Sequence, residues 1–198
     1  MVALTTSQST VGAVLSVASI GSIVGSLAVS AWGGPRRKVL AMMTTIALVG
    51  ALIAAAGLRP SVALVAAACF AVMAVVPITN TASQVIWQTK VPPAMQGRVF
   101  AIRRMISEAI TPAAFLLAGP LADGVFEPLL RPDGALAGSV GAVIGTGDGR
   151  GIGFLYVLTG LLMVILALVG YARPRVRNLE QELPDQIEDE SRVVSPGS

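Results

Sequence analysis

The chain has 198 residues and a formal net charge of +3, with 54% hydrophobic residues, 13% charged residues and a mean hydropathy of +0.77. A soluble domain carries about 25% charged residues, so this chain has too few charges to cover a water-facing surface. Its apolar content also excludes a disordered chain, and its small charge gives no indication of nucleic-acid binding. The composition therefore predicts an integral membrane protein.

Missing residue types exclude several kinds of chemistry. The chain has no histidine, which excludes Ser-His-Asp catalysis, histidine-based zinc sites and a histidine proton relay. The one cysteine, Cys69, lies in an apolar run and is interpreted as a small core residue. No Walker A pattern occurs, and the glycines in 147–153 are interpreted as a flexible loop. We predict no enzyme activity, no metal and no cofactor.

Five apolar segments are long enough to cross a bilayer, which requires about 20 residues in a helix. They follow a polar segment at 1–10 and are predicted at about 11–32, 39–58, 62–87, 99–122 and 152–171. Residues 90–98 are predicted as a loop, and 123–151 as a long glycine-rich connection. The fold prediction is an all-α membrane bundle over 11–172, followed by a charged cytoplasmic tail at 173–198.

Lysine and arginine in the short loops predict the orientation. The basic segments are the loop after the first span (Arg36, Arg37, Lys38), the loop after the third (Lys90, Arg98) and the segment after the fifth (Arg173, Arg175, Arg177). We therefore expect these segments and the C-terminus in the cytoplasm of a multi-pass cell-membrane protein, with the N-terminus outside. An outside N-terminus without a signal sequence predicts that an earlier span is missing.

Two features of the first span and its loop invite competing interpretations. Gly21 and Gly25 form a G-x-x-x-G pattern, which lets helix backbones approach closely in lipid. We interpret it as a helix-packing surface. The basic run Arg36, Arg37 and Lys38 is a topology signal, or else a gate loop that pairs with acids or helix ends in one conformational state.

Polar residues within the third and fourth spans are the candidate functional residues. Arg104 and Glu108 lie one helical turn apart and can pair, and Arg103 is adjacent. Ionisable residues within a span usually face a cavity or a partner helix, although arginines near an interface can snorkel to it. Asn80 and Gln84 also lie one turn apart, and they line a polar cavity or form hydrogen bonds between helices.

Three stretches of the chain resemble the C-terminal half of major facilitator superfamily (MFS) transporters, in the branch of macrolide-efflux and siderophore-export proteins. They are 21–38, 80–104 with its motif Gln96-Gly97-Arg98-Val99-Phe100-Ala101, and 118–123. The resemblance implies that the five spans correspond to the family's eighth to twelfth helices. It also implies proton-coupled export of a small amphipathic compound, a drug-like molecule or a siderophore. Glu108 is then the candidate coupling or gating carboxylate and Arg104 its partner.

The family has twelve helices and moves substrate by rocking two halves around a central site, so one half alone forms no such site. The resemblance therefore implies a partner, an N-terminal half-transporter or a second copy. Three interpretations of the length stay open: a truncated product, half of a split transporter, or a homo-oligomer of half-units. The alternative function is a non-transporting subunit or anchor that packs against a partner through Gly21 and Gly25.

Overall fold

The computed structural model describes residues 8–35, 37–59, 61–147 and 149–177, and within these ranges it contains helices and turns but no strand. In chain order the elements are α1 (Gln8–Trp32), α2 (Lys38–Leu58), α3 (Val62–Lys90), α4 (Pro93–Gly119), the π-helix η2 (Pro120–Phe126), α5 (Glu127–Leu129), α6 (Val140–Ile144), α7 (Arg150–Ala172) and α8 (Pro174–Arg177). Five of the described helical segments are long and apolar enough to cross a membrane. The predicted all-α membrane fold with five spans is confirmed.

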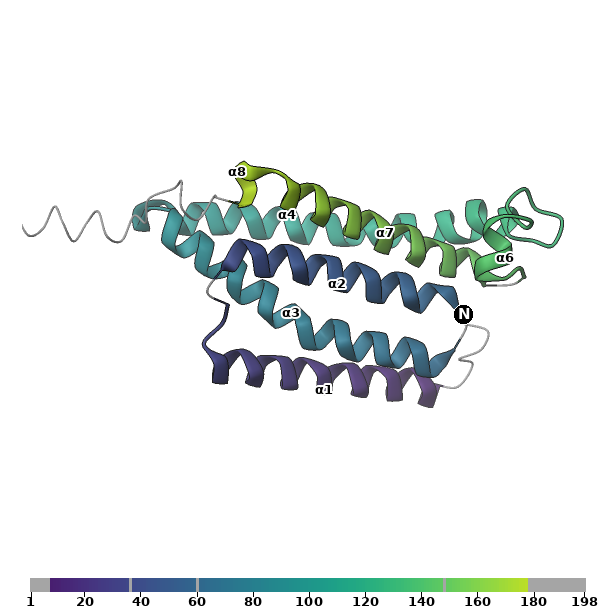
Figure 1. Ribbon diagram of the computed structural model, residues 1–198, viewed down its shortest axis with the longest axis horizontal. Coiled ribbons are helices and arrows are strands. Elements are labelled where there is room, and N and C mark those ends of the chain that lie inside the picture. Colours follow the sequence, from purple (N-terminus) through teal and green to yellow (C-terminus); the bar gives the residue numbers. More distant parts are fainter. Residues whose placement is uncertain (1–7, 36, 60, 148, 178–198) are drawn as a thin grey trace, which may run out of the picture.

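The long helices alternate in direction, so their connections gather at two ends (Figure 1). The α1–α2 and α3–α4 connections and α8 lie at one end, on the left of Figure 1, and the other connections lie at the opposite end. We call the first the basic end; its described cations are Arg37, Lys38, Lys90, Arg98 and Arg173. The three segments that the loop charges predicted on one side of the membrane therefore lie at the same end of the molecule.

Helices α2 and α7 pack antiparallel through two pairs of buried glycines. A Cβ placed on Gly50 would lie 2.6 Å from the carbonyl oxygen of Gly160, and one on Gly153 would lie 2.9 Å from the carbonyl oxygen of Gly57. Only a residue without a side chain permits backbones to approach this closely. The crossing of α2 and α7 is therefore fixed by backbone contact over two helical turns.

Helices α1 and α3 run parallel and meet through Gly21 and Gly25. A Cβ on Gly21 would overlap the carbonyl oxygen of Phe70, and one on Gly25 would overlap that of Ala74. From the first contact to the second, α1 advances four residues (21 to 25) and α3 also advances four (70 to 74), so the two helices stay in the same register. Helix α3 also packs on α2, and it thereby joins the two glycine-packed pairs into one bundle.

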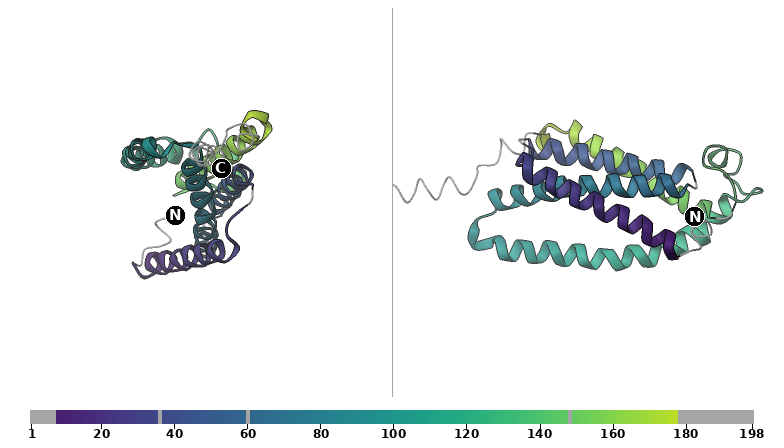
Figure 2. Two further views of the ribbon diagram at one scale, coloured as in Figure 1. Left: turned by 90° about the vertical axis from the view of Figure 1, so that its left-hand side faces the viewer. Right: turned by 90° about the horizontal axis from the view of Figure 1, so that it is seen from below.

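Helix α4 stands apart from this bundle. None of its residues is buried, and Phe115 and Leu116 are 78% and 76% exposed. It contacts α3 near the basic end, and at the other end its continuation η2 packs on α7. Figure 2 shows α4 set off from α2 and α7 in the view along the bundle. Most of its surface is left for lipid or for another polypeptide.

Three predicted loop segments are helical instead. The predicted loop at 90–98 is reduced to Val91 and Pro92, because Pro93 serves as the first residue of α4, where no N–H is needed. The helix predicted to end at 122 continues as η2, which begins at Pro120; this residue cannot donate the usual i→i−4 hydrogen bond. Residues 140–144 form the short helix α6.

The glycines predicted as one flexible loop divide between a turn and a helix. Gly147 and Gly149 have φ angles of 114° and 79°, whereas Gly151 and Gly153 are buried in the first turn of α7. Gly151 lies against η2 and α5, where a Cβ would be 2.7 Å from the amide nitrogen of Glu127. Close packing at both glycines, rather than flexibility, explains the second half of this run.

Candidate functional site at the α3–α4 contact and the basic end

The Arg103 side chain connects α4 to α3. Its Nη2 donates a 2.9 Å hydrogen bond to Oγ of Ser83, a buried residue, and its guanidinium carbon lies 5.5 Å from the ring centroid of Trp87. Ser83 and Trp87 are four apart on α3, so both face the same side. A charged hydrogen bond and a cation–π contact therefore hold Arg103 in place.

A second side chain secures the same corner. Nε2 of Gln96 donates 3.0 Å hydrogen bonds to the carbonyl oxygens of Gln88 and Val91. The last carbonyls of a helix lack intrahelical partners, so these bonds cap the C-terminus of α3. Gln96 and Arg103 lie two turns apart on α4, and together they anchor its first three turns to α3.

Arg104 and Glu108 lie on a different side of α4. Nε of Arg104 is 3.9 Å from Oε1 of Glu108, and their side chains are 84% and 73% exposed. An ion pair this open contributes between about 0 and 1 kcal/mol in water. The three candidate charges of α4 therefore face different ways: Arg103 turns toward α3, and the Arg104–Glu108 pair is exposed on the outside of the chain.

Asn80 and Gln84 lie exposed on α3, and no side-chain hydrogen bond of either is present among the described residues. Asn80 and Gln84 were the predicted site residues of α3, but the α3 residues that contact Arg103 are Ser83 and Trp87. The i, i+4 spacing of Ser83 and Trp87, together with the aromatic ring of Trp87, could have predicted a contact surface for an arginine. The structure does not bring Asn80 or Gln84 into contact with Glu108.

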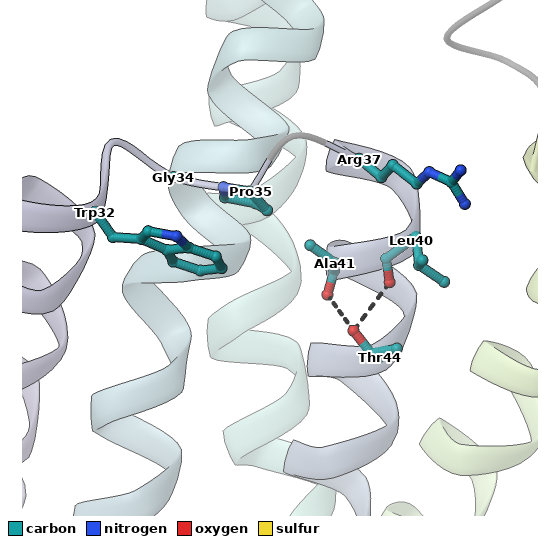
Figure 3. A pocket seen from close by; sticks show the side chains of 7 residues that line it. All are labelled: Trp32, Gly34, Pro35, Arg37, Leu40, Ala41 and Thr44. Carbon is teal, nitrogen blue, oxygen red and sulfur yellow. Dashed lines mark hydrogen bonds between the residues drawn. The ribbon is translucent and has the colours of Figure 1, made fainter.

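The loop between α1 and α2 forms an open pocket at the basic end. Gly33 and Gly34 turn the chain with φ angles of 76° and 84°, in the left-handed region that favours glycine. The pocket has a volume of about 590 Å³ and is lined by Trp32, Gly34, Pro35, Arg37, Leu40, Ala41 and Thr44 (Figure 3). Lys38 begins α2 at its side, and Arg36 lies outside the described residues.

Helix packing uses more glycines than the predicted pair, Gly21 and Gly25. Gly21 and Gly25 lie against α3 of the same chain. The pairs on α2 and α7 were overlooked, although Gly50 and Gly57 have the same seven-residue spacing as Gly153 and Gly160. That spacing places two glycines on one helix face, and finding it twice was a usable signal.

At the end opposite the basic end, Glu127 caps α7. Its carboxylate accepts hydrogen bonds from the backbone amides of Gly149 and Gly151, the latter at 2.8 Å. The free amides at a helix N-terminus attract a negative charge, so this arrangement stabilises the start of α7. The partners are 22 and 24 residues apart in the chain, and no local sequence pattern indicates the contact.

The described side chains offer groups for binding and for conformational coupling. Within the described residues, no cluster of three or more histidine, cysteine or acidic residues could hold a metal ion. What the site contains is one exposed ion pair, one arginine anchored between two helices, and a cationic pocket at the helix ends.

Over 173 residues the chain is 24% identical to the multidrug efflux pump Tap of Mycolicibacterium fortuitum, a match that covers 85% of this chain and 35% of that protein. The chain thus spans about a third of the length of this curated relative. No protein-family model and no solved structure match the chain. The chain is thus similar to part of an efflux pump, and five of its described helices are long and apolar enough to cross a membrane.

Proposed function

We propose that this chain supplies five helices of an MFS-type exporter, equivalent to the family's eighth to twelfth helices. The complete transporter moves a small amphipathic compound out of the cell and is driven by a proton gradient. The observation that carries this proposal is the similarity to a multidrug efflux pump along 85% of the chain. The alternating helices support it, as does the larger number of described cations at the basic end than at the opposite end, where Arg59, Arg131 and Arg150 lie.

In this proposal the basic end faces the cytoplasm, because cytoplasmic loops carry an excess of lysine and arginine. The remainder of the transporter, an N-terminal half or a second copy of this chain, covers the exposed side of α4. Helix α4 buries none of its residues within this chain and carries an ion pair on its outer side. A charge pair within a membrane span is expensive unless a cavity or another helix receives it.

The site residues take distinct roles. Glu108 is the coupling or gating carboxylate, and Arg104 is its ionic partner in one conformational state. Arg103 is a positioning residue that fixes the register of α4 on α3 through Ser83 and Trp87. Asn80 and Gln84, both exposed on α3, contribute to the substrate cavity of the complete transporter. Arg37 precedes α2 and Lys38 begins it, and their charges act as a topology signal for a cytoplasmic connection. Arg36, the third residue of this basic run, lies outside the described residues.

A geometric observation favours transport over the anchor function. The anchor hypothesis requires Gly21 and Gly25 to receive a partner helix. In the structure α3 of the same chain covers both glycines, so closely that an added Cβ would overlap its backbone. That surface is therefore not available to a partner while the bundle is intact.

The function is tested by flux measurements on the native product. The protein is purified from its own membranes with any associated chain and reconstituted in liposomes with an imposed proton gradient. We expect gradient-dependent movement of a fluorescent amphipathic dye, abolished by a protonophore. Folded protein that moves none of a panel of such dyes, while a partner protein co-purifies, would support the anchor function instead.

The arrangement of the halves needs a separate experiment. A tag is placed at the C-terminus at the genomic locus, and the membrane fraction is blotted. A band near 20.2 kDa indicates five helices that assemble with a separate chain or a second copy. A band at twice this mass or more indicates that all helices belong to one polypeptide.

A further inference from the structure

The pocket at the basic end combines apolar walls with a cationic rim. Figure 3 shows the Trp32 ring beneath the loop, Ala41 and Thr44 across from it, and the Arg37 side chain pointing outward at the edge. The Thr44 hydroxyl donates to the carbonyl oxygens of Leu40 and Ala41 at 2.9 and 3.0 Å, so the preceding turn of α2 accepts its hydrogen bond. The inner surface is therefore mostly aliphatic and aromatic.

The charge at this rim has no counter-charge nearby in the sequence. The first 107 residues contain no aspartate or glutamate. Of the acidic residues that the structure describes, Asp123, Glu127 and Asp133 belong to the opposite end and Glu108 belongs to α4. Arg37 is exposed and has no acidic partner within the described residues. The other acidic residues, Asp148 and the six at 180–190, lie outside the described residues. An anionic group would be attracted to this rim.

The position of the pocket suits a lipid. Trp32 closes α1 and is 69% exposed, which is typical of an aromatic residue at the membrane–water interface. The pocket lies between the end of α1 and the start of α2, where the apolar spans begin. A molecule with an anionic head and an acyl chain would meet Arg37 at the rim and apolar helix surface below it.

We propose that this pocket binds the phosphate headgroup of an anionic phospholipid, with Arg37 on the phosphate and Trp32 and Leu40 against the glycerol and the upper acyl chain. Basic pockets between membrane helices bind lipid headgroups by this combination of contacts. The proposal goes beyond transport and does not depend on it. It requires only that the basic end lie at a membrane surface.

Lipid retention measured by native mass spectrometry tests the proposal on the intact 198-residue chain. Phosphatidylglycerol and phosphatidylcholine with the same acyl chains are added to separate detergent samples. We expect the wild type to retain phosphatidylglycerol preferentially, and Arg37→Gln to weaken its binding about fivefold, the effect of one basic residue near a membrane surface. Arg59→Gln is the matched control, because Arg59 is an exposed arginine at the opposite end of α2.

Two further measurements identify which part of the lipid is recognised. Glycerol phosphate is added as a competitor at the concentration of the lipid: retention of the lipid supports a site that also binds the acyl chain, and displacement of the lipid would indicate a site for a free anion and overturn the lipid assignment. Trp32→Ala should weaken retention of phosphatidylglycerol and leave helical circular dichroism unchanged, because Trp32 is exposed. Equal losses in Arg37→Gln and Arg59→Gln, or equal retention of the two lipids by the wild type, would overturn the proposal.

Discussion

Helices α7 and α4 have similar lengths, but α7 packs closely on the rest of the chain and α4 does not. Helix α7 lies with its glycines against the backbone of α2, and four of its residues are buried. Helix α4 has no buried residue; Gln96 and Arg103 hold its first three turns to α3, and its continuation η2 packs on α7 at the other end. Backbone contact through glycine makes the first a fixed part of the bundle.

This difference in packing leaves α4, and not α7, open to contacts outside this chain. Lipid provides no hydrophobic force between helices, so close packing and polar contacts hold them together. Helix α4 lacks close packing along its middle and carries there the one ion pair found among the described residues. Under the proposed function, α4 is therefore the helix that completes its contacts in the whole transporter.

The largest expected effect comes from adding a methyl group to the glycine-packed pair. In Gly160→Ala the new Cβ would lie 2.6 Å from the amide nitrogen of Ala54, and overpacking of this kind costs about 1–3 kcal/mol. Denaturant unfolding in micelles, followed by far-UV circular dichroism, measures the change. Gly97→Ala on α4 is the control, since nothing lies within 4 Å of its Cβ position; equal losses in the two variants would refute the comparison.

The next effect distinguishes the two neighbouring arginines of α4. Arg103→Ala removes the partner of buried Ser83 and should cost about 1–3 kcal/mol, because an unsatisfied buried hydroxyl remains. Arg104→Ala removes only an exposed pair and should change stability by less than about 1 kcal/mol. Trp87 fluorescence in a Trp32→Phe background should shift in the first variant alone. A matching shift in both would mean that Arg103 does not anchor α4.

A smaller and more local effect is expected where η2 and α5 meet α7. Glu127→Gln removes the negative charge at the N-terminus of α7 and should cost about 0.5–2 kcal/mol. Hydrogen–deuterium exchange should speed up at the first turn of α7 and stay unchanged at the first turn of α2. Uniform acceleration throughout the bundle would indicate that Glu127 is not a local cap.

The apolar segments correctly predicted the five membrane-spanning helices and their approximate positions, because length and hydropathy decide which segments can cross a bilayer. The predicted bounds of the fourth span, 99–122, differ from those of α4, Pro93–Gly119, for a physical reason. Prolines and a glycine in 92–97 predicted a loop, yet Pro93 is accommodated at the first helical position. Pro120 likewise alters the helix to a π-helix without ending it.

The site could be predicted only in part. The i, i+4 spacing of Arg104 and Glu108 correctly indicates that they face one another, because helix geometry is local. Arg103 turns toward Ser83 because of how α3 and α4 lie against each other. The residue pattern within either helix does not predict that arrangement. The cap that Glu127 provides depends in the same way on a contact between distant segments.

Glu108→Gln tests most directly whether the outer side of α4 takes part in transport. The substitution removes an exposed ion pair, so stability should change by less than about 1 kcal/mol. In liposomes carrying equal amounts of the folded native product, we expect proton-driven dye efflux to fall to the level of protein-free liposomes. Efflux at the wild-type rate would contradict the role of Glu108 and, with it, the account of α4.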